Sequence, residues 1–446
     1  MRSITEIVRQ FKQNWTEELS EQSIANACRD SGMTWIKSLL DPIVTVQIFM
    51  VQILHGNTAC QHLPHLCRMT FTSAAYCKAR FRVKLKVFQL LLLRCVDSIE
   101  RETLDAGRWL GHRVFFVDGS SFSMPDTPVL QACFGQPSGQ KPGCGFPTAH
   151  WLAMLHMGTG MITQVLTSPL RTHDMSRTKE LHPELQPNDL LVADRAFCSF
   201  AHLCLLIERR VDAVLRVHQQ TIVDFTPGRD HVIPGKGKVI KGLPRSKWLR
   251  RLGVQDQVVQ WLKQPKNKPN WMTTEQFASL PNEITVRELR YDVNQKGFRT
   301  KQITLVTTLL DETDYPRLDL ADLFRRRWEI ETNFGHIKTT MKMDVLKCQT
   351  VDGILKELHV FALIYNLVRQ LIVHAAAQQL VPINRISFID ALRWLQAAEY
   401  GDELGRLFVN QDRPNRCEPR VRKRRPKKYK LMNKPRKQLK LELTRQ

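Results

Sequence analysis

The feature that most constrains the fold is a series of short apolar segments that begins at residue 113. RVFFVDG, HWLAMLHM and MITQVLTSPL come first in the chain, and DLLVADRAF and DAVLRVH then flank the helical segment AHLCLLIERR. Gly, Pro, Asp or Asn bounds most of these segments, which is typical of strands. A meander of strands followed by strands that alternate with helices predicts an α/β fold with a mixed sheet flanked by helices.

The rest of the chain divides into parts of different character. The periodicity predicts helices through 1–112, although the alternating basic and apolar segment 76–88 alone would favour a strand. We expect residues 113–217 and 303–375 to form two parts of the α/β core, and 218–302 to form a β-rich insertion with two good strands, EITVRELRYDV and TKQITLVTTLL. Residues 376–446 form a C-terminal region whose Lys- and Arg-rich tail predicts disorder when it is alone.

The charge of the chain indicates the class of partner. The formal net charge is +23, while 43% of the residues are hydrophobic, which favours a folded protein that binds a polyanion, above all nucleic acid. The apolar runs 43–54 and 87–93 are shorter than the roughly 18 residues of a membrane span. With no secretory signal at the N-terminus, we expect a cytoplasmic protein. The loop PGKGKVIKG lacks GxxxxGK[ST], which excludes a nucleotide cofactor of that type.

The cysteines do not predict a disulfide framework. There are eleven, an odd number, and none forms a CxxC pair. Cys60, His62, His65 and Cys67 are four possible zinc ligands in one short segment. Such crowding rarely allows tetrahedral convergence, so we favour a helix-and-loop segment over a metal site.

Two aspartates follow apolar strand-like runs. Asp118 ends the run in FFVDGSS, and Asp194 ends the run in LLVADRAF. An aspartate at a strand end is commonly a turn or cap residue. The carboxyl edge of an α/β sheet is also where ligand-binding groups gather, so both remain candidates for a site.

A predicted long helix from about residue 319 supplies a third acid. At about 100° per residue, one arc of roughly 60° holds Phe324, Arg327, Glu331 and Lys338. An adjoining apolar stripe consists of Ile330, Phe334, Ile337 and Met341. Glu329 lies about 160° from Glu331 and should face solvent. The alternative is an ordinary amphipathic helix with an Arg–Glu pair at i,i+4.

Together these motifs resemble the DDE transposases of the insertion sequence four family. Phe324, Arg327, Glu331 and Lys338 match the family signature of Tyr, two residues, Arg, three residues, Glu, six residues, Lys. DGSSFSMPDT matches the first family aspartate at Asp118, ADRAFCSF matches the second at Asp194, and GQPSGQKPGCGFP (135–147) is also typical. The resemblance covers about 110–345. One departure is Phe324, where the family usually has tyrosine.

The resemblance implies a ribonuclease H-like core and a site for two divalent cations, Mg²⁺ or Mn²⁺. Asp118 would bridge the ions, while Asp194 and Glu331 would each complete one site. Arg327 would clamp a DNA phosphate and Lys338 would add point charge. Phe324 would lie at the same DNA-binding position without a hydroxyl.

The resemblance also implies the reaction and the partners. Water would nick the element end, and the freed 3′ hydroxyl would attack, commonly through a hairpin, before strand transfer into target DNA. The residues 1–112 would bind DNA ends, and a homodimer would pair the two ends. In the insertion, Trp248, Trp261 and Trp271 are candidates to stack on a flipped base, although core packing is favoured for each.

Two other functions stay open from the sequence. A related metal-dependent nuclease would share the three carboxylates but would join no ends. A catalytically decayed or domesticated DNA-binding protein would keep the basic ends of the chain and tolerate loss of the carboxylates. Assays of end joining, and alanine at Asp118, separate these alternatives.

Overall fold

The computed structural model describes residues 19–102, 107–170, 172, 174–234, 242–293, 302–397, 404–411 and 432–444. Most of the 234–242 loop and most of the basic tail lie outside these residues. The amino-terminal residues 1–18 also lie outside them.

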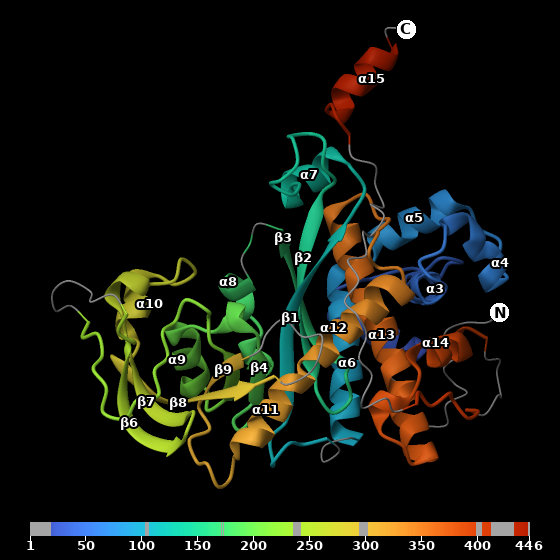
Figure 1. The fold of residues 1–446 in the computed structure, drawn as a ribbon. Coiled ribbons are helices and arrows are strands. Elements are labelled where there is room, and N and C mark those ends of the chain that lie inside the picture. Colours follow the sequence, from blue (N-terminus) through green and yellow to red (C-terminus); the bar gives the residue numbers. More distant parts are fainter. Residues whose placement is uncertain are drawn as a thin grey trace.

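The strands form a nine-stranded mixed sheet in the order β3-β2-β1-β4-β5-β9-β8-β7-β6 (Figure 1). They are β1 (Val114–Ser123), β2 (Thr148–His156), β3 (Ile162–Pro169), β4 (Leu190–Ala193), β5 (Asp212–Arg216), β6 (Ser246–Gly253), β7 (Asp256–Leu262), β8 (Glu283–Asp292) and β9 (Gln302–Thr307). The strands β1, β4 and β5 are parallel, and the other neighbouring pairs are antiparallel. The predicted α/β class with a mixed sheet is confirmed.

The predicted β-rich insertion continues this sheet. The strands β6, β7 and β8 lie within 218–302, and β9 starts at its last residue. Because β9 pairs with β5 on one side and β8 on the other, the insertion and the core share one hydrogen-bonded platform. The domain boundaries themselves stay predictions.

Helices cover both faces of the sheet. The amino-terminal ones are α2 (Glu21–Asp30), α3 (Pro42–Leu54), α4 (Leu63–Cys67), α5 (Ser73–Arg82) and α6 (Leu85–Glu102). The segment 76–88 thus forms helices, with Val83 as an extended residue between them. The later helices are α7 (Pro128–Phe134), α8 (Asp174–Thr178), α9 (Phe200–Glu208), α10 (Thr274–Ser279), α11 (Arg317–Arg326), α12 (Trp328–Gly335), α13 (Val351–Gln379), α14 (Phe388–Ala397) and α15 (Arg436–Thr444).

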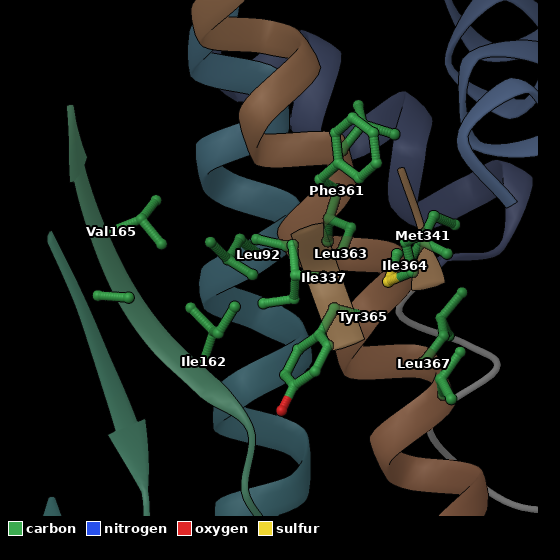
Figure 2. Packing of buried hydrophobic residues seen from close by; sticks show 14 of the residues in the cluster. Leu92, Ile162, Val165, Ile337, Met341, Phe361, Leu363, Ile364, Tyr365 and Leu367 are labelled. Atoms are coloured by element: carbon green, nitrogen blue, oxygen red, sulfur yellow. The ribbon is translucent and has the colours of Figure 1, made fainter. Parts of the chain in front are cut away.

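A large hydrophobic cluster, which we call the first core, joins the amino-terminal helices, α13 and one face of the sheet. Figure 2 shows residues from α6, β3 and α13 packed together, among them Leu92, Ile162 and Phe361. By length and composition α13 could span a membrane, but 83% of its apolar window is buried inside this fold. A second core on the opposite face packs α9 and α10 against the sheet.

The second core contains a buried pair of histidines. The Nε2 atoms of His182 and His202 lie 3.1 Å apart, and their rings stack with centroids 5.1 Å apart. Burial lowers the pKa of His182 to about 3 and that of His202 to about 4. Both imidazoles are therefore neutral in the folded protein at pH 7.

Acidification is expected to destabilise the fold through this pair. The unfolded chain takes up protons near pH 6.5, whereas the folded histidines do so only near pH 3 to 4, so stability is lost as the pH falls below about 6.5. Between pH 7 and pH 5 we expect a loss of about 2 kcal/mol per histidine. Urea unfolding at both pH values measures it. If His202→Gln shows the same pH dependence as the wild type, the pair is not the cause.

Candidate active site

The sheet register brings Asp118 and Asp194 side by side. Val117 on β1 is paired with Ala193 on β4, and Ala193 is paired with Leu215 on β5. The next residue on each strand is Asp118, Asp194 and Arg216 respectively. These three residues therefore form one row across three parallel strands, at the carboxyl ends of β4 and β5.

The three side chains point to the first-core face of the sheet. Side chains alternate between faces along a strand, and the residues two positions earlier, Phe116 and Val192, belong to the first core. Asp194 lies just after β4 but keeps an extended backbone, with φ −77° and ψ 175°. The row therefore faces α11 and α12, whose Phe324 and Ile330 pack in the same core.

One predicted detail of Asp118 is wrong. The sequence predicts that its strand stops there, but β1 continues to Ser123 because it stays paired with β2 beyond the last β4 partner. Asp118 thus lies where the parallel pairing ends, inside a longer strand. The site is therefore located by the end of the parallel pairing between β1 and β4, and not by the end of β1 itself.

The predicted single long helix is also divided. The helix α11 ends at Arg326, α12 begins at Trp328, and a π-helix follows over His336–Thr340. The predicted apolar stripe is confirmed as buried, since Ile330, Phe334, Ile337 and Met341 all lie in the first core. The junction residue between the two helices is Arg327, which the turn aims at the sheet.

Arg327 links two of the carboxylates. Its Nη1 atom lies 3.1 Å from Asp118 Oδ2, and its Nη2 atom lies 3.5 Å from Glu331 Oε1. The guanidinium also lies over the rings of Phe324 and Trp328, 5.7 Å from each centroid. Only 4% of Arg327 is exposed, so in this structure its charge is directed to the carboxylates.

Contacts rather than exposure distinguish Glu331 from Glu329. Glu329 was expected to face solvent, and its side chain is 33% exposed, whereas that of Glu331 is 45% exposed. Exposure therefore does not separate the two residues. Glu329 accepts a hydrogen bond from Arg326 at 3.0 Å, outside the row. Glu331 instead shares Arg327 with Asp118.

The carboxylates repel one another electrostatically. Burial raises the pKa of Asp118 above its ordinary value, and the negative charges of Glu331 and Asp194 add to this, while Arg327 and the Gly119 N–H oppose it. Asp194 Oδ1 is buried and accepts no hydrogen bond from any residue that the structure describes, and the Arg216 guanidinium pairs with it at 3.6 Å. A bound cation relieves repulsion of this kind between neighbouring carboxylates.

These residues fit a divalent cation by chemistry, since all three offer carboxylate oxygens, the ligands that Mg²⁺ and Mn²⁺ prefer. As placed, no three Asp, Glu, His or Cys side chains in the described residues are grouped closely enough to hold a metal ion. Arg327 lies between two of the carboxylates instead. The predicted metal ligands stay a proposal on this basis.

The two remaining signature residues lie on the same side of the sheet. The Lys338 Nζ atom donates to the Ser121 carbonyl at 2.7 Å and to Ser120 Oγ at 3.1 Å. Lys338 thus fastens the π-helix to β1 beside Asp118. Phe324 is 1% exposed and packs in the first core, so its burial gives no support to a direct DNA contact.

The sequence analysis did not identify two residues that lie near the row of Asp118 and Asp194. Arg216 ends the strand-like run DAVLRVH, and the strand-end argument that selected Asp118 and Asp194 would also have selected it. Tyr291 on β8 had no such indication, because its position depends on the insertion joining the core sheet.

The other candidates lie away from the row. Trp261 donates to the Glu288 carboxylate at 2.8 Å and packs with Trp271 against the second core. Trp248 lies on β6 at the far edge of the sheet. Cys60, His62, His65 and Cys67, the four possible zinc ligands, lie on the short helices Cys60–His62 and Leu63–Cys67, and form no metal-binding group in the described residues.

Comparison with known proteins agrees with the predicted family. The family described as "Transposase DDE domain" matches residues 109–367, more than half of the chain. The chain is 25% identical, over 340 residues, to "Transposase InsG for insertion sequence element IS4" of Escherichia coli (strain K12), covering 72% of this chain and 70% of that protein.

Among solved structures, the chain resembles a chain of the "piggyBac transposase synaptic complex with hairpin DNA" with a TM-score of 0.43 and 11% identity, covering 89% of this chain and 80% of that chain. The residues matched by the family include the row of Asp118, Asp194 and Arg216 and the helices α11 and α12. The chain therefore belongs to the DDE transposases of the insertion sequence four family.

Proposed function

We propose that this protein is a DNA transposase that binds the terminal inverted repeats of an insertion sequence, cleaves at their ends and joins the 3′ hydroxyl ends to target DNA. The observation that carries the proposal is the row of Asp118 and Asp194 on adjacent parallel strands, with Glu331 tied to it through Arg327. The meander β3-β2-β1, followed by parallel β4 and β5, supports a ribonuclease H-like core.

Asp118, Asp194 and Glu331 would together hold two divalent cations, either Mg²⁺ or Mn²⁺. Such ions stabilise charge on the attacking and leaving oxygens of a phosphodiester. Two observations support this assignment: a buried Asp194 oxygen that accepts no hydrogen bond from the described part of the chain, and the repulsion between the negative charges at Asp118.

The basic residues of the site would position the carboxylates and contact the DNA backbone. Arg327 holds Asp118 and Glu331 together in the free protein, and on DNA its guanidinium would contact a phosphate in bidentate fashion. Lys338 keeps the edge of β1 in place through Ser121 and contributes positive charge beside Asp118. The amino-terminal helices would bind the DNA ends, and two copies of the chain would pair them. Such a protein would work in the cytoplasm, on the DNA of the nucleoid.

End joining tests this function directly. The purified chain, given labelled duplexes from the ends of its own element, is expected to cleave them and join their 3′ hydroxyls to target DNA when Mg²⁺ or Mn²⁺ is added. Chelation with EDTA should stop both steps. Gel analysis of the labelled products measures them.

The two alternatives give different products. Cleavage without joining would indicate a metal-dependent nuclease. Binding of the terminal duplex without cleavage in either metal would indicate a decayed or domesticated DNA-binding protein, and would refute the proposed activity.

A further inference from the structure

The strand β8 of the insertion contains a tyrosine, Tyr291, that lies near the row of Asp118, Asp194 and Arg216. Arg216 on β5 is paired with Leu305 on β9, and Leu305 is paired with Leu289 on β8. The row of Asp118, Asp194 and Arg216 therefore continues across the sheet to Leu289. Tyr291 lies two residues further along β8.

Direction and face both place Tyr291 beside this row. Because β5 and β8 are each antiparallel to β9, they run the same way, so Tyr291 lies beyond Leu289 toward the carboxyl ends of the core strands. Residues two apart share a face, and Leu289 and Tyr291 both pack on the first core. The aspartates, Arg216 and Tyr291 thus face the same side.

Three arginines and one aspartate influence the phenol electrostatically. Arg216 and Arg327, which pair with the site carboxylates, lower the pKa of Tyr291, as does Arg325, whereas Asp322 raises it. Burial raises the pKa of Tyr291 to about 12, and the arginines only partly oppose this. The hydroxyl therefore keeps its proton at neutral pH and is a hydrogen-bond donor.

Packing explains the ring of Tyr291 but not its hydroxyl. Tyr76, Tyr315 and Tyr365 each use their hydroxyl in a hydrogen bond, to Gln52, His112 and Gly160 respectively. The Tyr291 hydroxyl has no hydrogen bond to any residue that the structure describes, and its side chain is half-buried. A donor in this position is available to a ligand.

We propose that Tyr291 donates a hydrogen bond to one DNA phosphate that lies between Arg216 and Arg327. The proposal rests on the proposed function, because it places the substrate backbone along the row of carboxylates. Two guanidinium groups and a phenolic donor match the negative oxygens of a phosphate. Phe324, buried on the same side, offers no hydroxyl for this contact. The insertion would thereby contribute a DNA-binding residue to the proposed active site.

The test is equilibrium binding of terminal duplexes that each carry one uncharged methylphosphonate, compared between the wild type and Tyr291→Phe. The variant removes only the hydroxyl, and it should bind the unmodified duplex about ten-fold more weakly, as expected for one hydrogen bond to a charged group. At one phosphate position the methylphosphonate should weaken the variant less than it weakens the wild type, because the hydroxyl contact is already absent and only the two guanidinium contacts remain to be lost.

Tyr315→Phe is the matched control, because it removes a hydroxyl that contacts His112 at 2.8 Å. It should leave the positional pattern of the wild type unchanged. The inference is overturned if Tyr291→Phe binds like the wild type, or if it weakens binding equally at every methylphosphonate position. Because binding is measured without cleavage, a wild type that binds but never cuts would refute the proposed function separately.

Discussion

Replacing Asp118 by asparagine is expected to reduce DNA cleavage about a thousand-fold or more while leaving DNA binding and folding intact. Asparagine keeps the shape of the side chain but removes the negative charge that would hold a cation. A metal ligand of this kind supports several kcal/mol of charge stabilisation in the transition state, and each 1.36 kcal/mol is a factor of ten in rate. Single-turnover cleavage of a labelled terminal duplex measures the loss.

Glu329→Gln is the matched control for the acidic residues. Glu329 is close in sequence to Glu331 but pairs with Arg326 outside the row, so its loss should change the rate less than a few-fold. Asp194→Asn and Glu331→Gln should behave like Asp118→Asn. Near-normal cleavage by any of these three variants would remove that residue from the proposed cation site.

Replacing Arg287 by methionine is expected to lower the free energy of unfolding by about 3–5 kcal/mol, the cost of leaving one partner of a buried ion pair uncompensated. Arg287 is fully buried, and its guanidinium forms a bidentate pair with Asp256 at 2.7 and 2.5 Å. It also donates to the Tyr315 carbonyl at 2.7 Å. Denaturant unfolding followed by circular dichroism measures the change.

Arg250→Met is the control for this effect. Arg250 pairs with Glu312 at 3.6 Å, but both side chains are about half exposed, so its loss should cost less than about 1 kcal/mol. The double variant Arg287→Met with Asp256→Leu should recover part of the stability, because it removes the unpaired carboxylate. Equal losses for Arg287→Met and Arg250→Met would contradict the importance of burial.

The strand pattern predicted the α/β class because alternation and turn residues are local properties of the sequence. The same local rules found the apolar stripe of α12, since Ile330 and Phe334 are set by helical spacing. The end of β1 could not be found this way, because its continuation beyond Asp118 depends on pairing with β2.

The site, too, was only partly predictable from local sequence patterns. Asp118, Asp194 and Glu331 were selected largely by resemblance, and the register and Arg327 then relate them in space. A straight helix of 100° per residue could not predict that the chain divides at Arg327 and turns its guanidinium to the sheet. Tyr291 needed the order of β5, β9 and β8, which no local pattern contains.

The position of β9 also bears on how the chain folds. During synthesis β5 is made long before β9, while β6, β7 and β8 can already pair as a meander in between. Until β9 inserts, β5 and β8 both expose unpaired backbone edges, and such edges are where chains associate wrongly. Because this closure joins segments distant in sequence, it should be slow. Insertion of β9 is therefore the step at which a nascent chain is most exposed to aggregation.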